Sequence, residues 1–506
     1  MARYARGIGM LPGSMRSTVL LRHSGLAGFL SALALAVYWF LGDLALLALA
    51  VGLPVLVLVA VWSWPWPGSK AASDQVIDRL EAALHDRSEG PRQTGCFVVQ
   101  FDDPSRICDR HGRTLQSEVL AACIGRIRGA MRPGDRLFPL EDGSLVVVLA
   151  PSQRLDLEGM VRIAGRMQLV VQQPMVVGDI SVQLSCCIGF CHARQINAET
   201  GRALLEAAQI AADEAMRHSP GAIRAYTDDL ALIRATRDRL RSGFAEAIDA
   251  GQIRAHFQPQ VSTDSGEVSG MEALARWHHP DRGVLAPGDF LPALEGTDLM
   301  ELLGREMLNQ SLSALAEWNR AGLAVPAVSV NLSPQDLRDP QLPDRLAWAL
   351  DAHGLRPGRL TIEVLESVVA GVDDDIIRRN LDRIALMGCG VDLDDFGTGN
   401  ASITTIRQFS LQRLKIDRSF VRGVDYIRDQ QKLVTAILAL AEQLGLESLA
   451  EGVETQAEHA MLAQLGCGHV QGYVISKPLP PEEVASWLRQ HRERLPRALR
   501  IEMRAR

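Results

Sequence analysis

The 506-residue sequence is poor in aromatic side chains and in cysteine, and it has no excess of positive charge. Aromatic residues make up 5%, and eight unevenly spaced cysteines cannot form the dense disulfide scaffold of a small secreted domain, which indicates a reducing compartment. The net charge of −7 excludes a global basic surface for a nucleic-acid polymer. Hydrophobic residues make up 47%, so the chain is expected to fold, and its length predicts about three units.

Charge is almost absent from residues 25–62, where Asp43 is the single charged side chain. Two apolar runs, 26–41 and 44–62, flank it, and each approaches the roughly 30 Å of a bilayer core at about 1.5 Å per helical residue. Arginines precede the runs and a lysine follows them, which favours a cytoplasmic position for both ends. We expect a transmembrane helical hairpin with cytoplasmic soluble domains; one span kinked at Pro54 is the alternative.

Composition and periodicity divide the α/β chain into six segments. We expect a membrane anchor and linker at 1–73, a connecting helix at 74–94, an α+β domain at 95–226, a linker helix at 227–250, a second domain at 251–492 and a basic tail at 493–506. Within the α+β domain, the patterns predict strands at 96–101 and 180–191, a hairpin of 136–140 with 144–149, and helices at 115–131, 157–171 and 201–218.

The turn of that hairpin reads Glu141-Asp142-Gly143-Ser144-Leu145. In its order of elements the domain resembles the GGDEF (diguanylate cyclase) family, whose turn of that name holds GTP and metal. The family's turn glycines and its acidic pair are both replaced here, and its two metal-facing aspartates correspond to Gln100 and Asp102. A two-metal phosphoryl-transfer site needs more than one such carboxylate. The departures therefore predict a regulatory, cyclase-inactive domain.

One further feature of that family precedes the turn. Arg132 and Asp135 match the Arg-x-x-Asp spacing of the family's inhibitory product-binding site. A guanidinium can bind phosphate bidentately, but the same pair at the start of a strand can simply form a turn. Both interpretations stay open.

After residue 250, short apolar runs recur, each closing on a polar residue, with helical stretches between them. The closing residues include Glu272, Asn331, Glu363, Asp394, Lys415, Glu451 and Gln471. Repeated βα units predict a (β/α)8 barrel, which gathers the C-terminal ends of its strands at one rim. Several carboxylates, an amide and a lysine are therefore expected to meet there.

Residues 257–480 carry seven ordered motifs that resemble the EAL family of cyclic di-GMP phosphodiesterases. The motifs are Phe257-Gln258-Pro259, Glu272-Ala273-Leu274, Ser329-Val330-Asn331, Asp394-Asp395-Phe396-Gly397-Thr398-Gly399, Lys415-Ile416-Asp417, Glu451-Gly452-Val453-Glu454 and Gln471-Gly472-Tyr473. The resemblance implies an EAL barrel that uses two Mg²⁺ or Mn²⁺ ions.

The resemblance also implies roles for individual residues. The metal ligands would be Glu272, Asn331, Glu363, Asp394 and Asp395. Lys415 would orient or deprotonate the attacking water, with Glu451 as the alternative general base. The substrate contacts would be Gln258, Arg276 and Gln471. A loop that couples metal binding to dimerisation would include Glu366, Gly397 and Gly399, and Glu454 would support Glu451.

One departure from the EAL pattern is Leu365, which stands where the family has threonine between two glutamates. Both carboxylates remain, so catalysis is expected to survive. We expect hydrolysis of cyclic di-GMP to pGpG by a membrane-bound homodimer. The alternative is a receptor that binds cyclic di-GMP without turnover and signals through partners; the retained metal ligands favour the enzyme.

Overall fold

The computed structural model describes residues 69–86, 93–102, 105–140, 142–177, 180–196, 200–370, 375–399 and 402–495. The chain divides into two compact units, Met1–Ala231 and Leu232–Arg506. The predicted transmembrane hairpin lies outside the described residues. Among the helices of the described residues, none combines the length and apolar character that crossing a bilayer requires.

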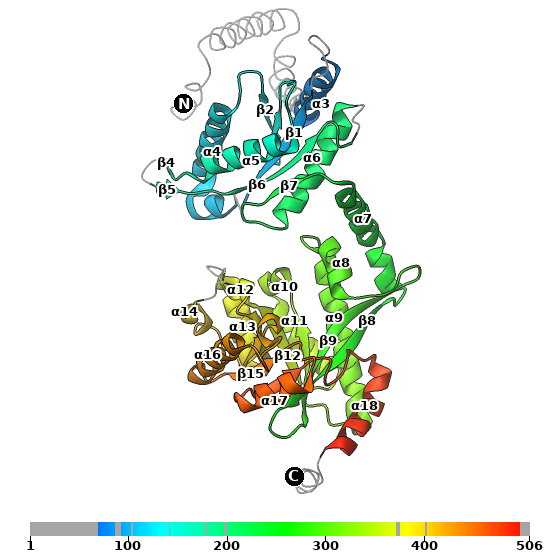
Figure 1. The fold of residues 1–506 in the computed structure, drawn as a ribbon. Helices are drawn as coiled ribbons and strands as arrows, with labels where there is room; N and C mark the ends of the chain where they lie inside the picture. Colours follow the sequence, from blue (N-terminus) through cyan, green and yellow to red (C-terminus); the bar gives the residue numbers. More distant parts are fainter. Residues whose placement is uncertain are drawn as a thin grey trace, which may run out of the picture. The chain divides into compact units, whose positions relative to one another are not determined.

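Unit 1 contains a five-stranded sheet in the order β2-β3-β1-β6-β7, shown in Figure 1. Its strands are β1 (Gly95–Phe101), β2 (Arg136–Pro139), β3 (Leu145–Val148), β6 (Cys186–His192) and β7 (Ile223–Ala225). Its helices are α3 (Ser69–His85), α4 (Ser105–Ala130), α5 (Leu157–Gln172) and α6 (Gly201–Met216). The continuous strand predicted at 180–191 is wrong, because β5 (Ile180–Val182) pairs with β4 (Met175–Val177) in a separate hairpin and β6 starts afterwards.

The alternation of side chains along β1 explains why helices cover both faces of this sheet. Phe97 and Val99 belong to the core beneath α4 and α5, whereas Cys96 and Val98 belong to the core beneath α3 and α6. Gly189 on β6 allows α6 to approach closely, since a Cβ there would lie 1.9 Å from a backbone atom of α6. The sheet is therefore buried on both sides.

Unit 2 is a barrel whose strands are surrounded by helices (Figure 1). Its strands are β8 (Ile253–Ser262), β9 (Val268–His279), β10 (Gly283–Leu285), β11 (Val328–Asn331), β12 (Leu360–Leu365), β13 (Gly390–Phe396), β14 (Arg413–Ile416), β15 (Glu447–Ala450) and β16 (His469–Gln471). Its longer helices are α8 (Pro287–Leu294), α9 (Leu299–Arg320), α11 (Leu342–Ala352), α13 (Asp375–Leu386), α16 (Arg428–Leu444), α17 (Gln456–Gln464) and α18 (Pro481–Arg494). Helix α7 (Asp228–Asp249) begins in the last residues of unit 1 and lies mostly in unit 2. Shorter helical turns are α10 (Pro334–Arg338), η2 (Pro357–Arg359), α12 (Glu366–Ala370), α14 (Ile403–Ile406) and α15 (Arg418–Val421).

The barrel closes because β8 pairs with both β9 and β16, and both of these pairings are antiparallel. The strands β9, β11, β12, β13, β14, β15 and β16 follow one another around the barrel in this order, and each pairs in parallel with the next. The expectation of a regular (β/α)8 barrel is therefore wrong at β8. Only a short turn at 263–267 joins β8 to β9, and a parallel pairing would need a crossover of a dozen or more residues.

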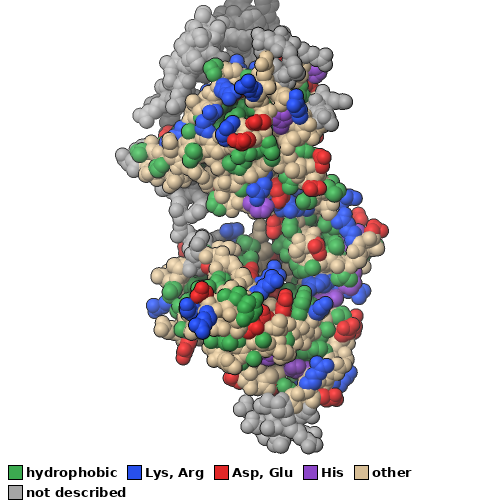
Figure 2. All heavy atoms as spheres, viewed as in Figure 1, with side chains coloured by type: hydrophobic (Ala, Val, Ile, Leu, Met, Phe, Trp, Pro, Cys, Tyr) green, Lys and Arg blue, Asp and Glu red, His purple; other side chains and the backbone are tan. Residues whose placement is uncertain are grey.

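Charged side chains have different distributions on the surface and in the interior. Figure 2 shows acidic and basic side chains interspersed with apolar ones over the visible face of each unit. Most of the buried charged side chains of the described residues lie in unit 2, and they include Glu272, Glu363, Asp392, Asp394 and Lys415. A buried charge is costly unless it is paired, so these residues mark the part of the barrel to examine for function.

Candidate active site

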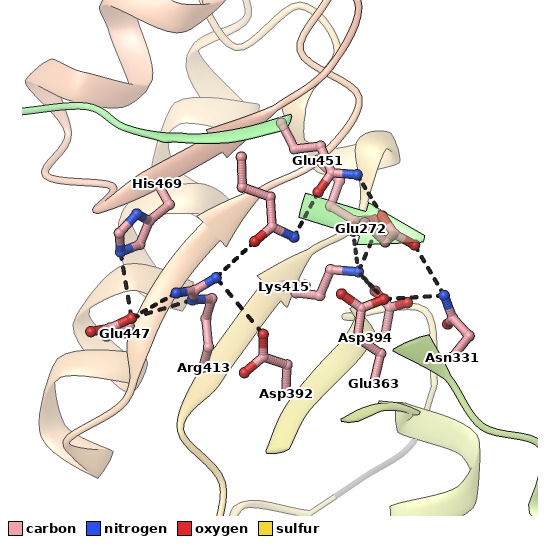
Figure 3. A network of polar contacts seen from close by, with 12 residues as sticks. Glu272, Asn331, Glu363, Asp392, Asp394, Arg413, Lys415, Glu447, Glu451 and His469 are labelled. Atoms are coloured by element: carbon pink, nitrogen blue, oxygen red, sulfur yellow. Dashed lines mark hydrogen bonds and ion pairs between the residues drawn. The ribbon is translucent and has the colours of Figure 1, made fainter. Parts of the chain in front are cut away.

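Lys415 lies at the centre of a group of carboxylates inside the barrel (Figure 3). Its side chain is fully buried. Its Nζ lies 2.6 Å from Glu451 Oε1, 2.9 Å from Glu363 Oε2 and 3.1 Å from Asp394 Oδ1. Glu272 Oε2 lies slightly further away, at 3.8 Å. These residues come from strands β9, β12, β13 and β14 and from the position after β15, so the barrel brings together the polar residues that the strand pattern predicted.

Side-chain amides link the carboxylates to one another. Asn331 Nδ2 donates to Glu272 Oε1 at 3.0 Å and to Glu363 Oε2 at 3.1 Å. Gln471 Nε2 donates to Glu272 Oε2 and to Gln258 Oε1, the latter at 3.1 Å. Two of the three predicted substrate-binding residues, Gln258 and Gln471, thus lie directly beside a predicted metal ligand.

An irregularity in β13 places the acidic pair of the site. The register of β13 against β14 shifts between Leu393 and Phe396, and Asp395 has a φ of 54°. A residue other than glycine rarely adopts this left-handed conformation, which costs on the order of 1–3 kcal/mol. The amide of Asp395 donates to Asp394 Oδ1 at 2.9 Å. The surrounding fold therefore holds both carboxylates at the strand end at the expense of local backbone strain.

The group carries more negative than positive charge, and its pKa values reflect this. Burial and the charge of Glu272 raise the pKa of Glu363 well above its ordinary value. Burial also raises the pKa of Glu451 to about 8, although Lys415 opposes the shift. Burial alone would lower the pKa of Lys415, but the surrounding carboxylates raise it well above its ordinary value. One ammonium cannot neutralise four ionised carboxylates, so a further positive charge would stabilise the ionised form of the group.

The residues present fit the divalent ions that the resemblance implies. Asp394, Asp395 and Glu451 each offer a carboxylate oxygen, and these oxygens lie within 4.8 Å of one another. Glu363 Oε1 is buried and has no hydrogen-bond partner. A buried polar atom without a partner is costly unless a further group binds it. Because the candidate ligands are all oxygen atoms, they suit hard cations such as Mg²⁺ or Mn²⁺.

The predicted loop residues are also connected. Glu366, the first residue of α12, is buried, and its Oε2 accepts hydrogen bonds from the backbone amides of Gly397 at 2.7 Å and Gly399 at 3.1 Å. These amides lie two and four residues after Asp395 in the chain. Leu365, which replaces the family's threonine, is partly exposed and takes no part in these contacts. The carboxylate of Glu366 therefore fastens the loop that carries the acidic pair.

Two other predicted site residues have different surroundings. Arg276 lies four positions beyond Glu272 on the same face of β9, and its Nη1 donates to the carbonyl of Ala275. The side chain of Glu454, expected to support Glu451, is exposed. Its backbone amide donates to Glu458 Oε2 at 3.0 Å.

Glu458 was not singled out from the sequence. It also accepts hydrogen bonds from the amides of Gly423 and Thr455, so its carboxylate holds the segment after Glu451. A capping-box pattern, Thr455 followed three residues later by Glu458, was the available signal.

Arg132 and Asp135 in unit 1 form a turn. Asp135 Oδ2 accepts from the amide of Arg132 at 2.9 Å, and Oδ1 accepts from the amide of Ala150 at 3.0 Å. The side chain of Arg132 is exposed. These contacts give Asp135 a structural role in the turn, as the second of the two interpretations expected.

The carboxylates at the degenerate GGDEF-like turn and at the one retained metal position of unit 1 are engaged by the protein itself. Asp102 accepts hydrogen bonds from Ser219 Oγ at 2.8 Å, the amide of Gly221 at 3.0 Å and Cys187 Sγ at 3.1 Å. Asp142 Oδ1 accepts from both the amide and the hydroxyl of Ser144. Glu141 lies outside the described residues. Neither described carboxylate is presented as a free metal ligand.

A second set of polar residues in unit 2 was missed. It consists of Gln260, Asp392, Arg413, Glu447 and His469, which we call the lower layer. Four of the five stand two positions along a strand from a predicted site residue, on the same face. The period of two in β-strands could have revealed them, but none of them was among the residues singled out from the sequence.

Comparisons with known proteins match both units. The profile of the EAL domain matches residues 241–478, and that of the diguanylate cyclase GGDEF domain matches residues 74–220. The oxygen sensor protein DosP of Escherichia coli is 32% identical over 394 residues, which make up 78% of this chain and 48% of that protein. The bifunctional diguanylate cyclase/cyclic di-GMP phosphodiesterase MucR of Pseudomonas aeruginosa is 30% identical over 411 residues, 80% of this chain and 59% of that protein.

A solved structure of the PaMucR phosphodiesterase in complex with c-di-GMP is 36% identical and covers 49% of this chain and 99% of that one, with a TM-score of 0.47. The chain spans only about half of the length of the curated relatives it matches.

Proposed function

Because the chain carries a GGDEF domain followed by an EAL domain, we propose that it is a phosphodiesterase that hydrolyses cyclic di-GMP to pGpG in unit 2. The observation that carries the proposal is the group at one rim of the barrel in which the buried Lys415 meets the buried Glu272, Glu363 and Asp394 and the partly exposed Glu451, with Asn331 bonded to two of them. A receptor without turnover, the alternative, has no need to keep so costly a set of buried charges.

Two divalent ions, held by Glu272, Asn331, Glu363, Asp394 and Asp395, would supply Lewis acidity against the anionic phosphodiester when bound. The protein's own residues then act on the water and the substrate. Lys415 stays charged among the carboxylates, so it donates hydrogen bonds and offsets negative charge that develops at the phosphate. Glu451 accepts the proton of the attacking water, because its side chain is 19% exposed and can be reached by water. The side chains of Lys415 and Glu363 are fully buried.

The remaining predicted residues bind the substrate. Gln258 and Gln471 are hydrogen-bonded to each other and lie beside Glu272, where they can contact the sugar-phosphate ring. Arg276 lies further along the same face of β9, where a guanidinium suits the second phosphate. Attack by water on one phosphorus breaks one bond to a ribose oxygen, which leaves as a hydroxyl after taking up a proton, and linear pGpG remains.

The decisive experiment is incubation of the detergent-purified full-length protein with cyclic di-GMP and Mg²⁺ or Mn²⁺. We expect pGpG by chromatography, and none when EDTA is present. The Lys415→Ala variant, which loses the central ammonium, should form none while it remains folded. Binding of cyclic di-GMP by the wild type without any pGpG would support the receptor alternative instead.

We assign the GGDEF domain a regulatory, cyclase-inactive role. The hydrogen bonds that occupy Asp102 and Asp142 support this assignment, as does Gln100 at a metal position, where its amide donates to Asp213. Product binding at Arg132 would require the exposed guanidinium alone, because the carboxylate of Asp135 is engaged.

The proposal places the enzyme at the inner membrane, with both units in the cytoplasm. Its support is the almost uncharged segment 25–62 with arginines before it. A homodimer is part of the proposal, because the loop at 397–399 that Glu366 fastens corresponds to the dimerisation-coupled loop of the EAL family.

A further inference from the structure

The lower layer lies beneath the active site, that is, toward the N-terminal ends of the parallel strands β13 to β16. Within this layer, we propose that Arg413 is a positioning residue that sets the direction of a hydrogen-bond chain ending on Glu272. This inference rests on the proposed phosphodiesterase function. Figure 3 shows the layer and the site as one continuous network of polar contacts. The network passes through the interior of the barrel.

Arg413 is held firmly at the start of this chain. Its Nη2 and Nε both donate to Glu447 Oε2, at 3.0 and 3.3 Å, and its Nη1 lies 3.8 Å from Asp392 Oδ2. The side chain of Arg413 is 12% exposed and that of Asp392 is 3% exposed. His469 Nε2 lies 3.4 Å from the same oxygen of Glu447. The guanidinium therefore has little freedom to turn.

From this fixed position the chain runs upward through two amides. Arg413 Nη1 donates to Gln260 Oε1 at 3.0 Å, and Gln260 Nε2 donates to Gln471 Oε1 at 2.9 Å. Gln471 Nε2 then donates to Glu272 Oε2. Each amide thus accepts from the residue below it and donates to the residue above it.

Arg413 fixes this direction at the lower end of the chain, while Gln258 Oε1 and the carboxylate of Glu272 accept from Gln471 at the upper end. An amide side chain can turn over and exchange its donor and acceptor ends, but a guanidinium only donates and stays charged at any physiological pH. With Arg413 below, Gln260 must present its oxygen downward, so its NH₂ faces Gln471. The NH₂ of Gln471 in turn faces the carboxylate of Glu272. Without that donor, Gln260 can reverse and turn its oxygen toward Gln471 Oε1, and the repulsion between the two oxygens would displace Gln471 from Glu272.

The barrel is built to accommodate this chain. Gly270 on β9 faces Gln260, and a Cβ at that position would lie 2.8 Å from Gln260 Oε1. A larger residue would push the amide away from Arg413. The space for the amide and the fixed donor beneath it are therefore provided by two different strands.

The consequence concerns a proposed metal ligand. A carboxylate that is oriented by a hydrogen bond binds an ion better, and removal of such an outer partner typically costs about 10–100-fold in metal affinity or activity. We expect loss of Arg413 to weaken Mn²⁺ binding and to lower kcat, although Arg413 touches neither the ion nor the substrate.

The test uses full-length protein with substitutions at Arg413 and Asp392. Arg413→Met alone leaves Asp392 buried without its partner and can fail to fold, so the informative variant is the double substitution Asp392→Asn with Arg413→Met. Asp392→Asn alone keeps the donor to Gln260 and should behave as the wild type. Arg413→Lys keeps a donor but cannot also bind Glu447 bidentately, and it should fall between the two.

Two measurements separate positioning from stability. Calorimetry gives the Mn²⁺ affinity and chromatography gives kcat and KM for pGpG formation, with thermal unfolding as a check on folding. The matched control is Arg359→Met, which removes a barrel arginine that donates to Val325 and Asn319 and is not connected to the site. The control should lower the unfolding temperature and leave the Mn²⁺ affinity unchanged.

The expected result is a fall of about 10–100-fold in Mn²⁺ affinity and kcat for the folded double variant. The inference is overturned if the folded double variant binds Mn²⁺ and turns over substrate like Asp392→Asn alone. A wild type that binds Mn²⁺ and makes no pGpG would instead contradict the proposed function, and the Mn²⁺ affinities would still decide the role of Arg413.

Discussion

The backbone of Gly397 is pressed against the ring of Phe420. A Cβ at position 397 would lie 2.5 Å from Phe420 Cε2, and the φ of Gly397 is 100°. Phe420 belongs to α15, which follows the strand that carries Lys415. Two independent constraints at Gly397 therefore determine the path of the loop after the acidic pair. One is a backbone conformation that favours glycine, and the other is a space too small for a methyl group.

Gly397→Ala should accordingly disturb the active site more than an ordinary glycine substitution. The matched control is Gly445→Ala, where φ is also positive, at 70°, and no atom lies within 4 Å of the added methyl group. We expect the control to cost about 1 kcal/mol in the free energy of unfolding and to retain kcat. Gly397→Ala should cost more and lower kcat at least tenfold. Denaturant unfolding measures the free energy of unfolding, and pGpG formation measures kcat. Equal effects of the two variants would contradict a special role of Gly397 in the path of the loop.

Glu366→Gln should loosen the same loop from its other side. The substitution keeps the size of the side chain but removes the charge from two hydrogen bonds to backbone amides, and bonds to charged groups contribute about 1.5–3 kcal/mol each. We expect kcat for pGpG formation to fall roughly tenfold or more. Glu483→Gln on the exposed first turn of α18 is the control and should have no effect. Unchanged turnover in Glu366→Gln would show that the loop does not depend on this carboxylate.

Unit 1 should make no cyclic di-GMP from GTP. The substitution Glu272→Ala in unit 2 prevents removal of any product, so accumulation over time reports synthesis alone. Because Asp102 and Asp142 are occupied by the protein's own donors, we expect no product above a control without enzyme, with either Mg²⁺ or Mn²⁺. Accumulation of cyclic di-GMP in that variant would show that unit 1 can form a competent site.

Residues 1–69 should hold the protein on membranes. The full-length protein is expected to remain in the membrane fraction after a carbonate wash and to be released only by detergent, because an apolar segment of this length is costly in water. A matched sample in which four of the apolar residues at 44–62 are replaced by lysine should lose this behaviour. Full-length protein that washes off with carbonate alone would refute the anchor.

The sequence was sufficient to predict the polar residues at the rim of the barrel, because these residues follow apolar runs at βα spacing. Glu363, Asp394 and Lys415 lie where the strand pattern predicted. The direction of β8 was not predictable in the same way, because an alternating pattern does not distinguish an antiparallel neighbour from a parallel one. The break between β5 and β6 was hidden by the continuous β-forming composition of 180–191.

The lower layer escaped prediction for a different reason. Asp392 and Arg413 stand in strands whose other residues are mostly apolar, where a charge normally argues for an exposed face. Their partners lie far away in sequence, since Arg413 meets Gln260 from a strand about 150 residues earlier. The period of two can place each of these residues on the inner face of its strand, but only the closed barrel brings them together, so their pairing is not visible in local spacing.

Asp394 is the most sensitive test of the two-ion assignment. It contacts Lys415 at 3.1 Å and also belongs to the cluster with Asp395 and Glu451, so we expect its charge to act on both proposed ions. Asp394→Asn preserves the size of the side chain and removes the charge that offsets two dications. We expect pGpG formation to fall roughly 10³-fold or more, equivalent to about 4 kcal/mol in the activation barrier.

The control for Asp394→Asn is Asp382→Asn on α13, a partly exposed carboxylate that accepts a hydrogen bond from Ser410, and turnover should be unchanged. Turnover is measured across a series of Mn²⁺ concentrations, so that weaker ion binding is distinguished from a slower chemical step. Activity that returns fully at high Mn²⁺ would assign Asp394 to ion binding alone. Near-normal turnover at all Mn²⁺ concentrations would exclude it as a shared ligand, because the loss of one negative charge between two dications cannot be without effect.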